Sequence, residues 1–412
     1  MADDKNENDR RAAPGHVPEV LRPLGSLLAV VAHPDDESFG LGGVLGTLAA
    51  SGRKVSLLCF TAGEGSTVGA SSELATTRTA ELAAAARILG VAEHWMEGLP
   101  DGELAALPDG ELADRVRAHV EESGADALVV LERSGVTGHP DHRSATAAAL
   151  DVAAAAGVPV LEWGLPASVC HTLGAELGAQ LVPLTDGEVI RLTVERDRHW
   201  QAIAAHTSQD PGNPLLRRRL ELLGDTETLR LVRPPLDAQL ARFVSRTGCR
   251  AGPGADPGER ALLLDDLIAL ASLTELSTWP DALLAGDPTR AYAAHCLHDD
   301  SAGWSLAAIV TANGSATPPH DHSSWGAAAT VAGAERNVRY TGTCLDQLRE
   351  IGQEVVPVGG GYLFGSGDIH QAADAAGRTV SLHLLTGGGD PAAQHCPEPA
   401  SHDSAAASGV PA

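Results

Sequence analysis

Short apolar runs alternate with longer amphipathic stretches in the first half of the chain. The apolar runs predict strands at Leu27–Ala32, Val55–Thr61, His94–Glu97, Ala127–Leu131 and Val158–Trp163. Apolar positions at helical spacing predict helices at Leu41–Ser51, Leu74–Leu89, Glu111–Ser123 and Ser144–Ala155, with a further helix at about Val189–His206. Strands and helices that alternate in this way indicate an α/β domain whose parallel sheet is covered on both faces.

The pattern changes after about residue 230. Glycines and prolines between Gly248 and Glu259 indicate a linker or a loose loop, and Leu262–Leu276 has a helical pattern. The chain then forms short β-like runs with Gly and Pro between them, for example at Ser305–Thr311, Ala327–Val331, Gly361–Phe364 and Val380–Leu385. This spacing favours a small all-β barrel or jelly roll.

A length of 412 residues allows two or three domains. We expect a disordered N-terminus at 1–22, an α/β domain at 23–232, a linker at 233–258, a β-rich domain with leading helices at 259–390 and a disordered tail at 391–412. The two folded parts therefore belong to different fold classes.

Charge and composition narrow the range of partners. A formal net charge of -25 argues against nucleic acid or an anionic membrane as a partner. The six cysteines are scattered without a Cys-x-x-Cys pair, which favours a reduced, cytoplasmic setting. Residues 1–11 contain no apolar segment typical of a signal peptide, and no apolar run is long enough to span a bilayer. These properties are compatible with a small-molecule substrate and leave the oligomeric state open.

A burst of polar residues follows the first predicted strand. The segment His33-Pro34-Asp35-Asp36-Glu37 lies beyond the carboxyl end of that strand, where open α/β sheets place their ligands. His33 and Asp36 can turn toward one point as a metal-ligand pair, with Asp35 beside them as a base for metal-bound water. The alternative is a helix cap, since Pro and Asp are favoured in a first helical turn.

A second burst, Gly138-His139-Pro140-Asp141-His142, follows the strand Ala127–Leu131 and is expected on the same rim of the sheet. His142 is a candidate third ligand. Two imidazoles and one carboxylate, with a position open to water, are the ligand count of a catalytic zinc site. His139 is a further candidate that could polarise a carbonyl or donate a proton.

Together these two motifs resemble the PIG-L/LmbE family of zinc-dependent N-deacetylases, which includes enzymes that act on N-acetylglucosaminyl compounds and on mycothiol conjugates. The resemblance covers about residues 25–210. It implies a Rossmann-like α/β fold, zinc on His33, Asp36 and His142, and hydrolysis of an amide bond in an N-acyl-glucosaminyl or thiol-conjugate substrate.

The resemblance also implies roles for four further residues. Asp35 would be the general base, and His139 would stabilise the oxyanion or act as the acid. Arg78 and Asp101 would reach substrate hydroxyls. The alternative for Arg78 is a solvated charge on a helix face, and the alternative for Asp101 is a Pro-Asp-Gly turn.

A second histidine set lies in the β-rich part. His320 and His322 share one face of an extended segment, since side chains alternate with period two, and His370 follows a Gly-Asp turn. Three imidazoles can complete a metal site, whereas a lone histidine is more often structural.

This set resembles the cupin superfamily, a double-stranded β-helix fold, and within it the thiol dioxygenases of the cysteine dioxygenase type, over about residues 255–388. The matching segments are His320–Gly326, Gly333–Asn337, Gly367–His370 and Ser381–Leu384. The resemblance implies Fe(II) on His320, His322 and His370, O2 as co-substrate, oxidation of a thiol to a sulfinate, and a catalytic role for His383.

Three positions depart from the dioxygenase pattern. No cysteine is present near Gly326, Leu385 replaces the tyrosine that usually partners His383, and Ala294 occupies the place of the arginine that binds an amino acid's carboxylate. Arg290 is a candidate substitute for that arginine. A site without the carboxylate clamp fits a thiol whose carboxylate is masked as an amide.

The fusion suggests a bifunctional enzyme that acts on one thiol-bearing amide or on successive products of it. Three alternatives stay open: the β-rich domain binds or senses a ligand or metal without turnover, it holds nickel, zinc or manganese for other chemistry, or the first domain deacetylates sugars or antibiotics unrelated to thiols.

Overall fold

The computed structural model describes residues 17–184, 187–209, 212–284, 291–300, 303–312, 314–343, 347–375 and 377–387. It divides into two compact units, Met1–Gln239 and Leu240–Ala412. Most of the segments predicted to be disordered, 1–16 and 391–412, lie outside the described residues. Within the described part of the chain, no helix is both long and apolar enough to cross a bilayer.

The first unit is built on a seven-stranded sheet of order β3-β2-β1-β4-β5-β7-β6. Its strands are β1 (Ser26–Val31), β2 (Lys54–Thr61), β3 (Glu93–Leu99), β4 (Ala127–Leu131), β5 (Val160–Trp163), β6 (Glu188–Thr193) and β7 (Thr226–Val232). The first five are parallel, as predicted. β7 and β6 add antiparallel pairs at one edge, so the sheet is mixed.

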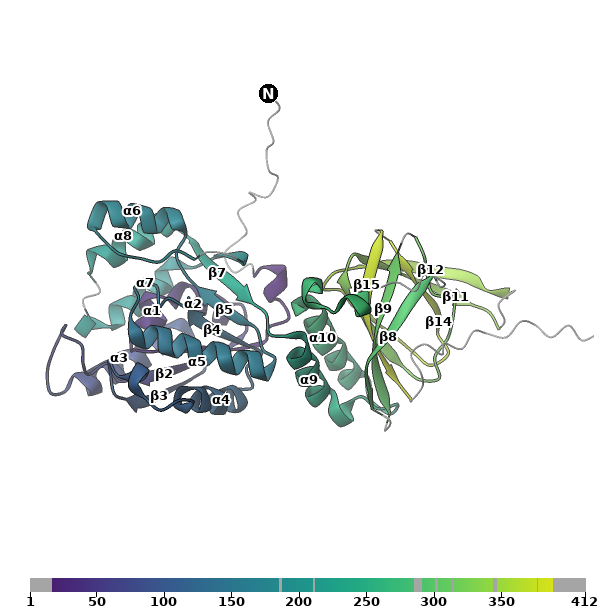
Figure 1. Cartoon of the computed structure of the whole chain (residues 1–412), viewed down its shortest axis with the longest axis horizontal. Coiled ribbons are helices and arrows are strands. Elements are labelled where there is room, and N and C mark those ends of the chain that lie inside the picture. Colours follow the sequence, from purple (N-terminus) through teal and green to yellow (C-terminus); the bar gives the residue numbers. More distant parts are fainter. Residues whose placement is uncertain are drawn as a thin grey trace, which may run out of the picture. The chain divides into compact units, whose positions relative to one another are not determined.

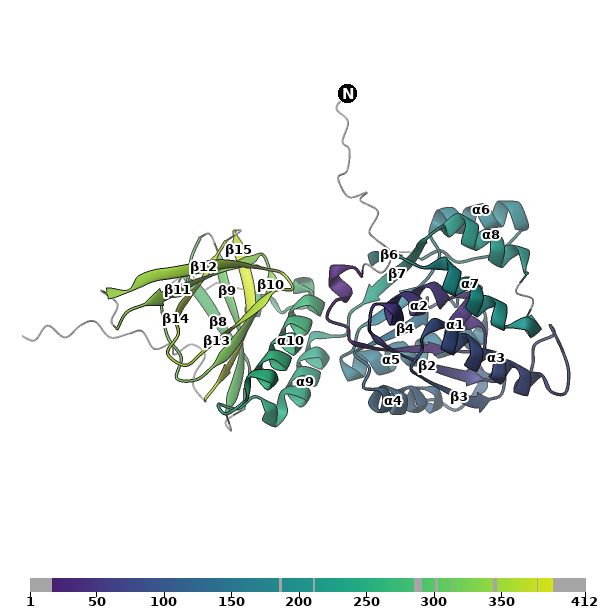
Figure 2. The ribbon, with the colours of Figure 1, turned by 180° about the vertical axis from the view of Figure 1, so that it is seen from behind.

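Helices cover both faces of this sheet. Helices α4 (Glu111–Ser123) and α5 (Pro140–Ala156) pack on one face against β1 and β4 (Figure 1). Helices α2 (Gly42–Ala50), α3 (Leu74–Leu89) and α7 (Arg196–Ala205) lie together on the other face (Figure 2). Because both faces of β1 are buried, its apolar run is continuous rather than alternating. Shorter elements are η1 (Glu19–Leu21), α1 (Asp36–Phe39), η2 (Leu104–Ala106), α6 (Ala167–Leu177), η3 (Thr207–Gln209) and α8 (Pro214–Leu223).

Two predictions for the first unit need correction. The helix predicted at Val189–His206 is strand β6 followed by helix α7, because Ile190 and Leu192 alternate inward while their neighbours are exposed. The N-terminal lead-in is not wholly disordered, since Leu21 in η1 is fully buried.

The second unit contains two antiparallel sheets of orders β13-β10-β15-β9-β8 and β12-β11-β14. The strands are β8 (Tyr292–Asp300), β9 (Trp304–Ala312), β10 (Gly326–Ala332), β11 (Ala334–Thr341), β12 (Arg349–Pro357), β13 (Gly361–Phe364), β14 (Ile369–Asp374) and β15 (Arg378–Thr386). This agrees with the predicted β-rich second half. The cupin assignment itself stays a prediction.

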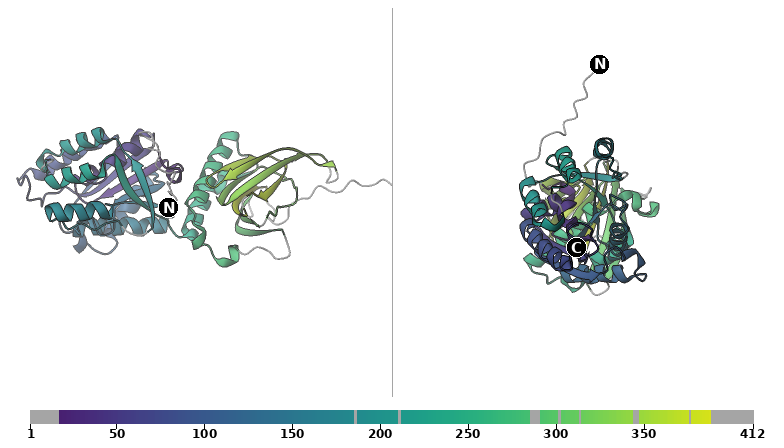
Figure 3. Two further views of the ribbon diagram at one scale, coloured as in Figure 1. Left: turned by 90° about the horizontal axis from the view of Figure 1, so that it is seen from above. Right: turned by 90° about the vertical axis from the view of Figure 1, so that its left-hand side faces the viewer.

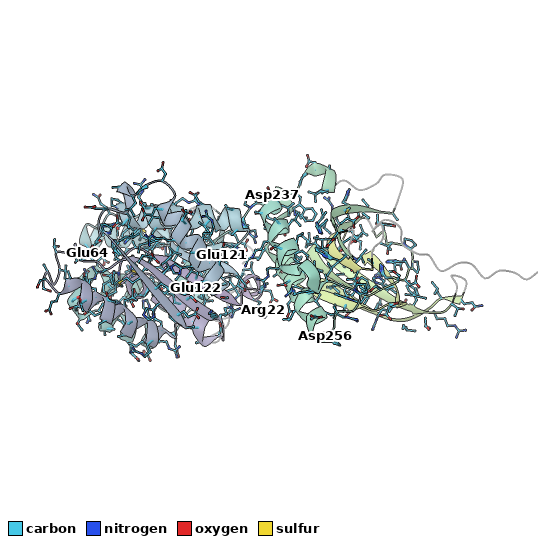
Figure 4. The ribbon with its side chains drawn as sticks, turned by 90° about the horizontal axis from the view of Figure 1, so that it is seen from below. Arg22, Glu64, Glu121, Glu122, Asp237 and Asp256 are labelled. Carbon is cyan, nitrogen blue, oxygen red and sulfur yellow. The ribbon has the colours of Figure 1, made fainter. Side chains whose placement is uncertain are left out.

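Helix α10 (Pro257–Leu273) covers strands β10, β13 and β15 of the larger sheet (Figure 3). Asp256, labelled in Figure 4, caps its N-terminus by accepting a hydrogen bond from the backbone N–H of Glu259. Within the second unit and its leading segment, η4 (Gly248–Arg250), η5 (Leu276–Thr278) and α11 (Asp281–Leu284) are single turns.

The predicted linker at 233–258 is largely helical, because it contains α9 (Leu236–Thr247). Apolar residues at Leu236, Leu240, Phe243 and Val244 follow helical spacing, and Phe243 is buried. The glycines and prolines on either side of α9 obscured that pattern in the sequence.

Candidate functional site

The first candidate site lies where β1 and β4 end. The chain leaves β1 at Val31, and α1 begins at Asp36, so His33 and Asp36 sit at the carboxyl end of a central strand. Asp35 has a backbone φ of 135°, a conformation that is costly for a residue with a Cβ. It occupies the N-cap position of α1, but its side chain makes no capping hydrogen bond, so the helix-cap alternative does not explain Asp35.

Three side chains converge on one point, as predicted. Nδ1 of His33 lies 3.1 Å from Nε2 of His142, which lies 3.1 Å from Oδ1 of Asp36. Nδ1 of His33 lies 3.7 Å from Oδ2 of Asp36. Ligand atoms about 2.0–2.1 Å from a tetrahedral zinc ion are roughly 3.3 Å apart, so this spacing suits zinc.

The proton positions on the two imidazoles also fit a cation. Nε2 of His33 faces carboxylate oxygens of Asp101 and Asp141 at 3.1 and 3.3 Å, so this nitrogen carries the proton of a neutral ring. Nδ1 of His142 faces the carbonyl oxygen of Gly135 at 3.2 Å and likewise carries the proton. When both rings are neutral, as metal ligation requires, the two nitrogens that face each other present lone pairs that a metal ion can bind.

The pKa shifts of these side chains follow from the negative charge around them. Burial opposes protonation of His33, but the hydrogen bond to Asp101 and the charge of Asp36 outweigh it and raise its pKa to about 9. Burial also opposes ionisation of Asp36, yet the neighbouring His142 and His33 hold its pKa well below the ordinary range. The site favours positive charge, and its set of two imidazoles and one carboxylate is consistent with zinc.

Asp35 is held by a buried arginine. Nη2 of Arg78 donates to Oδ2 of Asp35 at 3.0 Å and also to the Pro34 carbonyl, and Nη1 donates to the Gly63 carbonyl at 2.8 Å. Burial and the charge of Asp36 raise the pKa of Asp35 to about 7, although Arg78 opposes that rise. A carboxylate with a pKa near neutrality suits a general base.

Arg78 is only 3% exposed, so the alternative of a solvated helix-face charge is wrong. Its guanidinium reaches the candidate pocket, but most of its hydrogen bonds hold Asp35 and its neighbours. A contact with a substrate hydroxyl stays a prediction.

Asp101 and Asp141 act together on His33. Besides its contact with His33, Asp101 accepts a hydrogen bond from the backbone N–H of Gly65 at 2.9 Å through Oδ2. Asp141, fully buried, accepts from the backbone N–H groups of Gly102 and Leu104. The predicted Pro-Asp-Gly turn is thus present and also brings Asp101 to His33, a candidate metal ligand, whereas the contribution of Asp141 was not predicted.

A buried pair, Glu37 and His206, contacts the backbone of Asp35. Glu37 accepts a hydrogen bond from the backbone N–H of Asp35 at 2.9 Å, and its other oxygen lies 2.6 Å from Nε2 of His206. Both side chains are fully buried. Sequence reasoning did not identify this pair.

His139 occupies a capping position as well as the site. It is the N-cap of α5, and its Nδ1 accepts a hydrogen bond from the backbone N–H of Asp141, so the helix-cap role considered for the first motif is found at this residue of the second. Its ring centroid lies 4.8 Å from that of His33 and 4.9 Å from that of His142. Burial and the two neighbouring imidazoles lower its pKa.

These residues surround a cavity of about 320 Å³. Its other walls come from the loop after β2, which also carries Glu64 (labelled in Figure 4), and from the end of η3. Ser66 and Gln209, which sequence reasoning missed, hydrogen-bond to each other at 3.0 Å across it. The lining comprises His33, Asp35, Asp36, Gly65, Ser66, Arg78, Asp101, Gly102, His139, His142 and Gln209.

The second candidate site lies in the β-rich unit, where His320, His322 and His370 converge as predicted. One ring nitrogen from each lies within 4.8 Å of those of the other two. Nε2 of His322 and Nε2 of His370 are 3.1 Å apart, and the backbones of His320 and His370 pair as an isolated β-bridge. Apart from this bridge, the segment 318–323, which carries His320 and His322, belongs to no named strand.

The protons of two of these rings, His320 and His370, point away from the shared centre. Nδ1 of His320 donates to the Pro318 carbonyl at 2.9 Å, and Nδ1 of His370 faces Oδ1 of Asn337 at 3.3 Å. Among the described residues, no hydrogen-bond partner reaches the buried Nε2 of His320. Burial lowers the pKa of His320 to about 4 and of His322 to about 3, so these imidazoles are neutral at pH 7 and fit a metal ion.

His383 lies on β15 with partners that sequence reasoning missed. Its Nε2 is 3.1 Å from Oγ of Ser381 and 3.4 Å from Oε2 of Glu335. The Tyr362 hydroxyl donates to Oε1 of Glu335 at 2.6 Å. His383 thus lacks the tyrosine expected at the position of Leu385, but it is not isolated.

The structure shows the surroundings of two positions that depart from the dioxygenase pattern, Gly326 and Ala294. A Cβ added to Gly326 would lie 2.3 Å from the ring of Phe364, so this ring fills the room of a side chain at 326. The same ring packs against His322 and His370, each at 4.6 Å between centroids. Ala294 lies on β8, and Arg290 lies outside the described residues.

Comparison with known proteins concerns the first unit. The family profile described as GlcNAc-PI de-N-acetylase, PIG-L, matches residues 28–153. A 1D-myo-inositol 2-acetamido-2-deoxy-alpha-D-glucopyranoside deacetylase of Nakamurella multipartita is 32% identical over 178 residues, covering 34% of this chain and 57% of the relative. The chain spans about half the length of several similar relatives.

A solved structure of a deacetylase from the teicoplanin biosynthesis pathway is 26% identical, with a TM-score of 0.41, covering 50% of this chain and 98% of that chain. A 1D-myo-inositol 2-acetamido-2-deoxy-alpha-D-glucopyranoside deacetylase of Actinosynnema mirum is 30% identical over 226 residues, covering 44% of this chain and 80% of the relative. With that coverage and the match of the family profile, the chain belongs to the PIG-L family of de-N-acetylases.

Proposed function

We propose that the first unit is a zinc-dependent N-deacetylase or amidase that acts on an N-acylated glucosaminyl compound. The observation that carries the proposal is the convergence of His33, Asp36 and His142 beside the carboxylate of Asp35. The substrate that the relatives are named for is an acetamido-glucoside of inositol, and the polar cavity of about 320 Å³ suits a sugar ring.

Each residue of the site has a separate role in amide hydrolysis. Zinc held by the three ligands would polarise the amide carbonyl and lower the pKa of a bound water molecule toward about 7. Asp35 accepts the proton that is lost by the attacking water, and Arg78 keeps its carboxylate in place. His139 stands at the cavity wall, where it stabilises charge on the carbonyl oxygen or returns a proton to the leaving amine.

The test is release of free amine from 1D-myo-inositol 2-acetamido-2-deoxy-α-D-glucopyranoside and from N-acetylglucosamine by the zinc-loaded full chain. We expect turnover of at least one acetamido sugar, and its loss by about 100-fold or more in Asp35→Asn with zinc content unchanged, because a general base contributes about 10²–10⁴-fold. A zinc-loaded chain with no activity on either compound, or an Asp35→Asn variant with full activity, would refute the proposal.

We also propose that the second unit binds Fe(II) and oxidises a thiol with O2 to a sulfinate. Three neutral imidazoles that converge, two of them with their protons directed away from the shared centre, support a metal site. Neutral ligands leave the metal cationic, which suits a thiolate. In the reaction R–SH + O2 → R–SO2H, both oxygen atoms enter the product, so no external reductant is needed. Ala294 in place of the arginine clamp supports a thiol whose carboxylate is masked as an amide, and hence a bifunctional enzyme.

This second proposal is tested by O2 consumption after anaerobic Fe(II) loading of the full chain. We expect uptake with cysteinamide and little with free cysteine, and loss of uptake in His370→Ala. Equal uptake with both thiols would contradict the masked-carboxylate substrate. Metal binding without uptake would instead support a sensing module.

A further inference from the structure

A buried carboxylate lies behind the three-histidine cluster of the second unit. Glu335 is only 2% exposed. Its Oε1 accepts a hydrogen bond from the Tyr362 hydroxyl at 2.6 Å, and its Oε2 lies 3.4 Å from Nε2 of His383. Burying a charged carboxylate is costly unless it is paired, so its retention in a β-sheet interior needs a reason.

Strand pairing places this group next to the cluster. Tyr362 on β13 and His383 on β15 both pair with Ala328 on the intervening strand β10, so the two side chains share one face of the sheet. The ring of Tyr362 meets the ring of His370 edge-on, with 6.1 Å between centroids. One phenol therefore links Glu335 to a candidate metal ligand.

The electrostatic surroundings agree with this placement. Burial opposes ionisation of Glu335, but its bonds to His383, Ser381 and Tyr362 outweigh that effect and lower its pKa. Glu335 is thus a buried anion that Tyr362 connects to one of the three imidazoles, that of His370.

We infer that Glu335 is a positioning residue of the second metal site: without ligating the metal, its buried negative charge offsets the positive charge of a divalent ion on His320, His322 and His370. This inference rests on the proposed metal-binding function of the second unit. Three imidazoles bring no negative charge to a divalent cation, and the buried carboxylate, which the Tyr362 hydroxyl contacts beside His370, brings one. Loss of a partner behind the ligands typically costs about 10–100-fold in metal affinity.

The experiment measures the affinity of the full chain for Co²⁺ by competition with a fluorescent chelator, in an Asp36→Ala background that weakens the first site. We expect Glu335→Gln to weaken the remaining site by about 10–100-fold. Glu335→Asp, which keeps the charge, and Tyr362→Phe, which keeps the carboxylate, should lose less. Glu350→Gln removes the same charge at an exposed position on β12 and should leave the affinity unchanged.

A second readout separates the charge from the ligand set. The cobalt absorption bands of Glu335→Gln should match those of the parent, since the three imidazoles stay in place. Affinity equal to that of the parent would overturn the inference, as would equal losses in Glu335→Gln and Glu335→Asp, because the role would then be packing. If the parent binds Co²⁺ no better than its His370→Ala variant, the proposed metal site itself is refuted.

Discussion

Replacing Arg78 by methionine removes the charge that keeps Asp35 ionised. The guanidinium and the carboxylate are 3.0 Å apart, and both side chains are largely buried. Two unit charges about 4 Å apart interact by about 4 kcal/mol at an effective dielectric constant of about 20. This energy corresponds to a change of about 3 in pKa, and an arginine beside an aspartate is known to lower the pKa of the carboxyl by about 1–3.

The sign of the effect follows from the role of Asp35 as a base. Without Arg78, its pKa rises further above the value of about 7 that it has beside the arginine. A base works only when it is ionised, so the acid limb of the pH profile of kcat/KM should move to higher pH by about 1–3. At a fixed pH below that limb, kcat/KM should fall by about tenfold if the limb moves by about one pH unit, and by about 1,000-fold if it moves by about three.

The assay is deacetylation by the zinc-loaded full chain between about pH 5 and 10, with zinc content measured on each sample. Arg78→Lys keeps the charge and should leave the acid limb close to that of the parent. Arg115→Met removes an arginine that pairs with Glu97 and Glu111 and should not change the profile. An acid limb that stays in place in Arg78→Met, with zinc content unchanged, would refute the reasoning.

Three further predictions concern the first unit. Gly63→Ala places a Cβ 2.1 Å from Nη1 of Arg78 at a φ of +67° and should move the acid limb of the pH profile as Arg78→Met does. The control Gly124→Ala has nearly the same φ, +66°, but its Cβ meets nothing within 4 Å. It should therefore cost only about 1–2 kcal/mol in unfolding free energy. Burial and Arg196 lower the pKa of His199 to about 3, so only the unfolded chain takes up a proton at this residue between about pH 6.5 and 3. The free energy of unfolding should therefore fall by up to about 1.4 kcal/mol for each unit that the pH is lowered across that window. In thermal denaturation, His199→Gln should show a weaker dependence of stability on pH. Removal of metal with 1,10-phenanthroline should abolish deacetylation, and Zn²⁺ should restore it; activity that persists in metal-free protein would contradict the zinc site.

The sequence alone determined which residues meet at each candidate metal site. His33, Asp36 and His142 directly follow β1 and the loop after β4, and the carboxyl ends of parallel strands share one rim, so local pattern and topology suffice to bring them together. Local pattern also suffices to bring His320 and His322 together, because they are two residues apart on one extended segment. The bounds of α3 and α4 were likewise predicted from the sequence to the residue.

Only the tertiary structure decided what holds those residues in place. Arg78 reaches Asp35 from 43 positions away, and His206 reaches Glu37 from 169 positions away. Such pairs depend on where helices dock on the sheet, which periodicity does not encode. Strands β6 and β7 and the Tyr362–Glu335 contact were missed for the same reason, since they arise from pairing between segments whose own patterns are short or ambiguous.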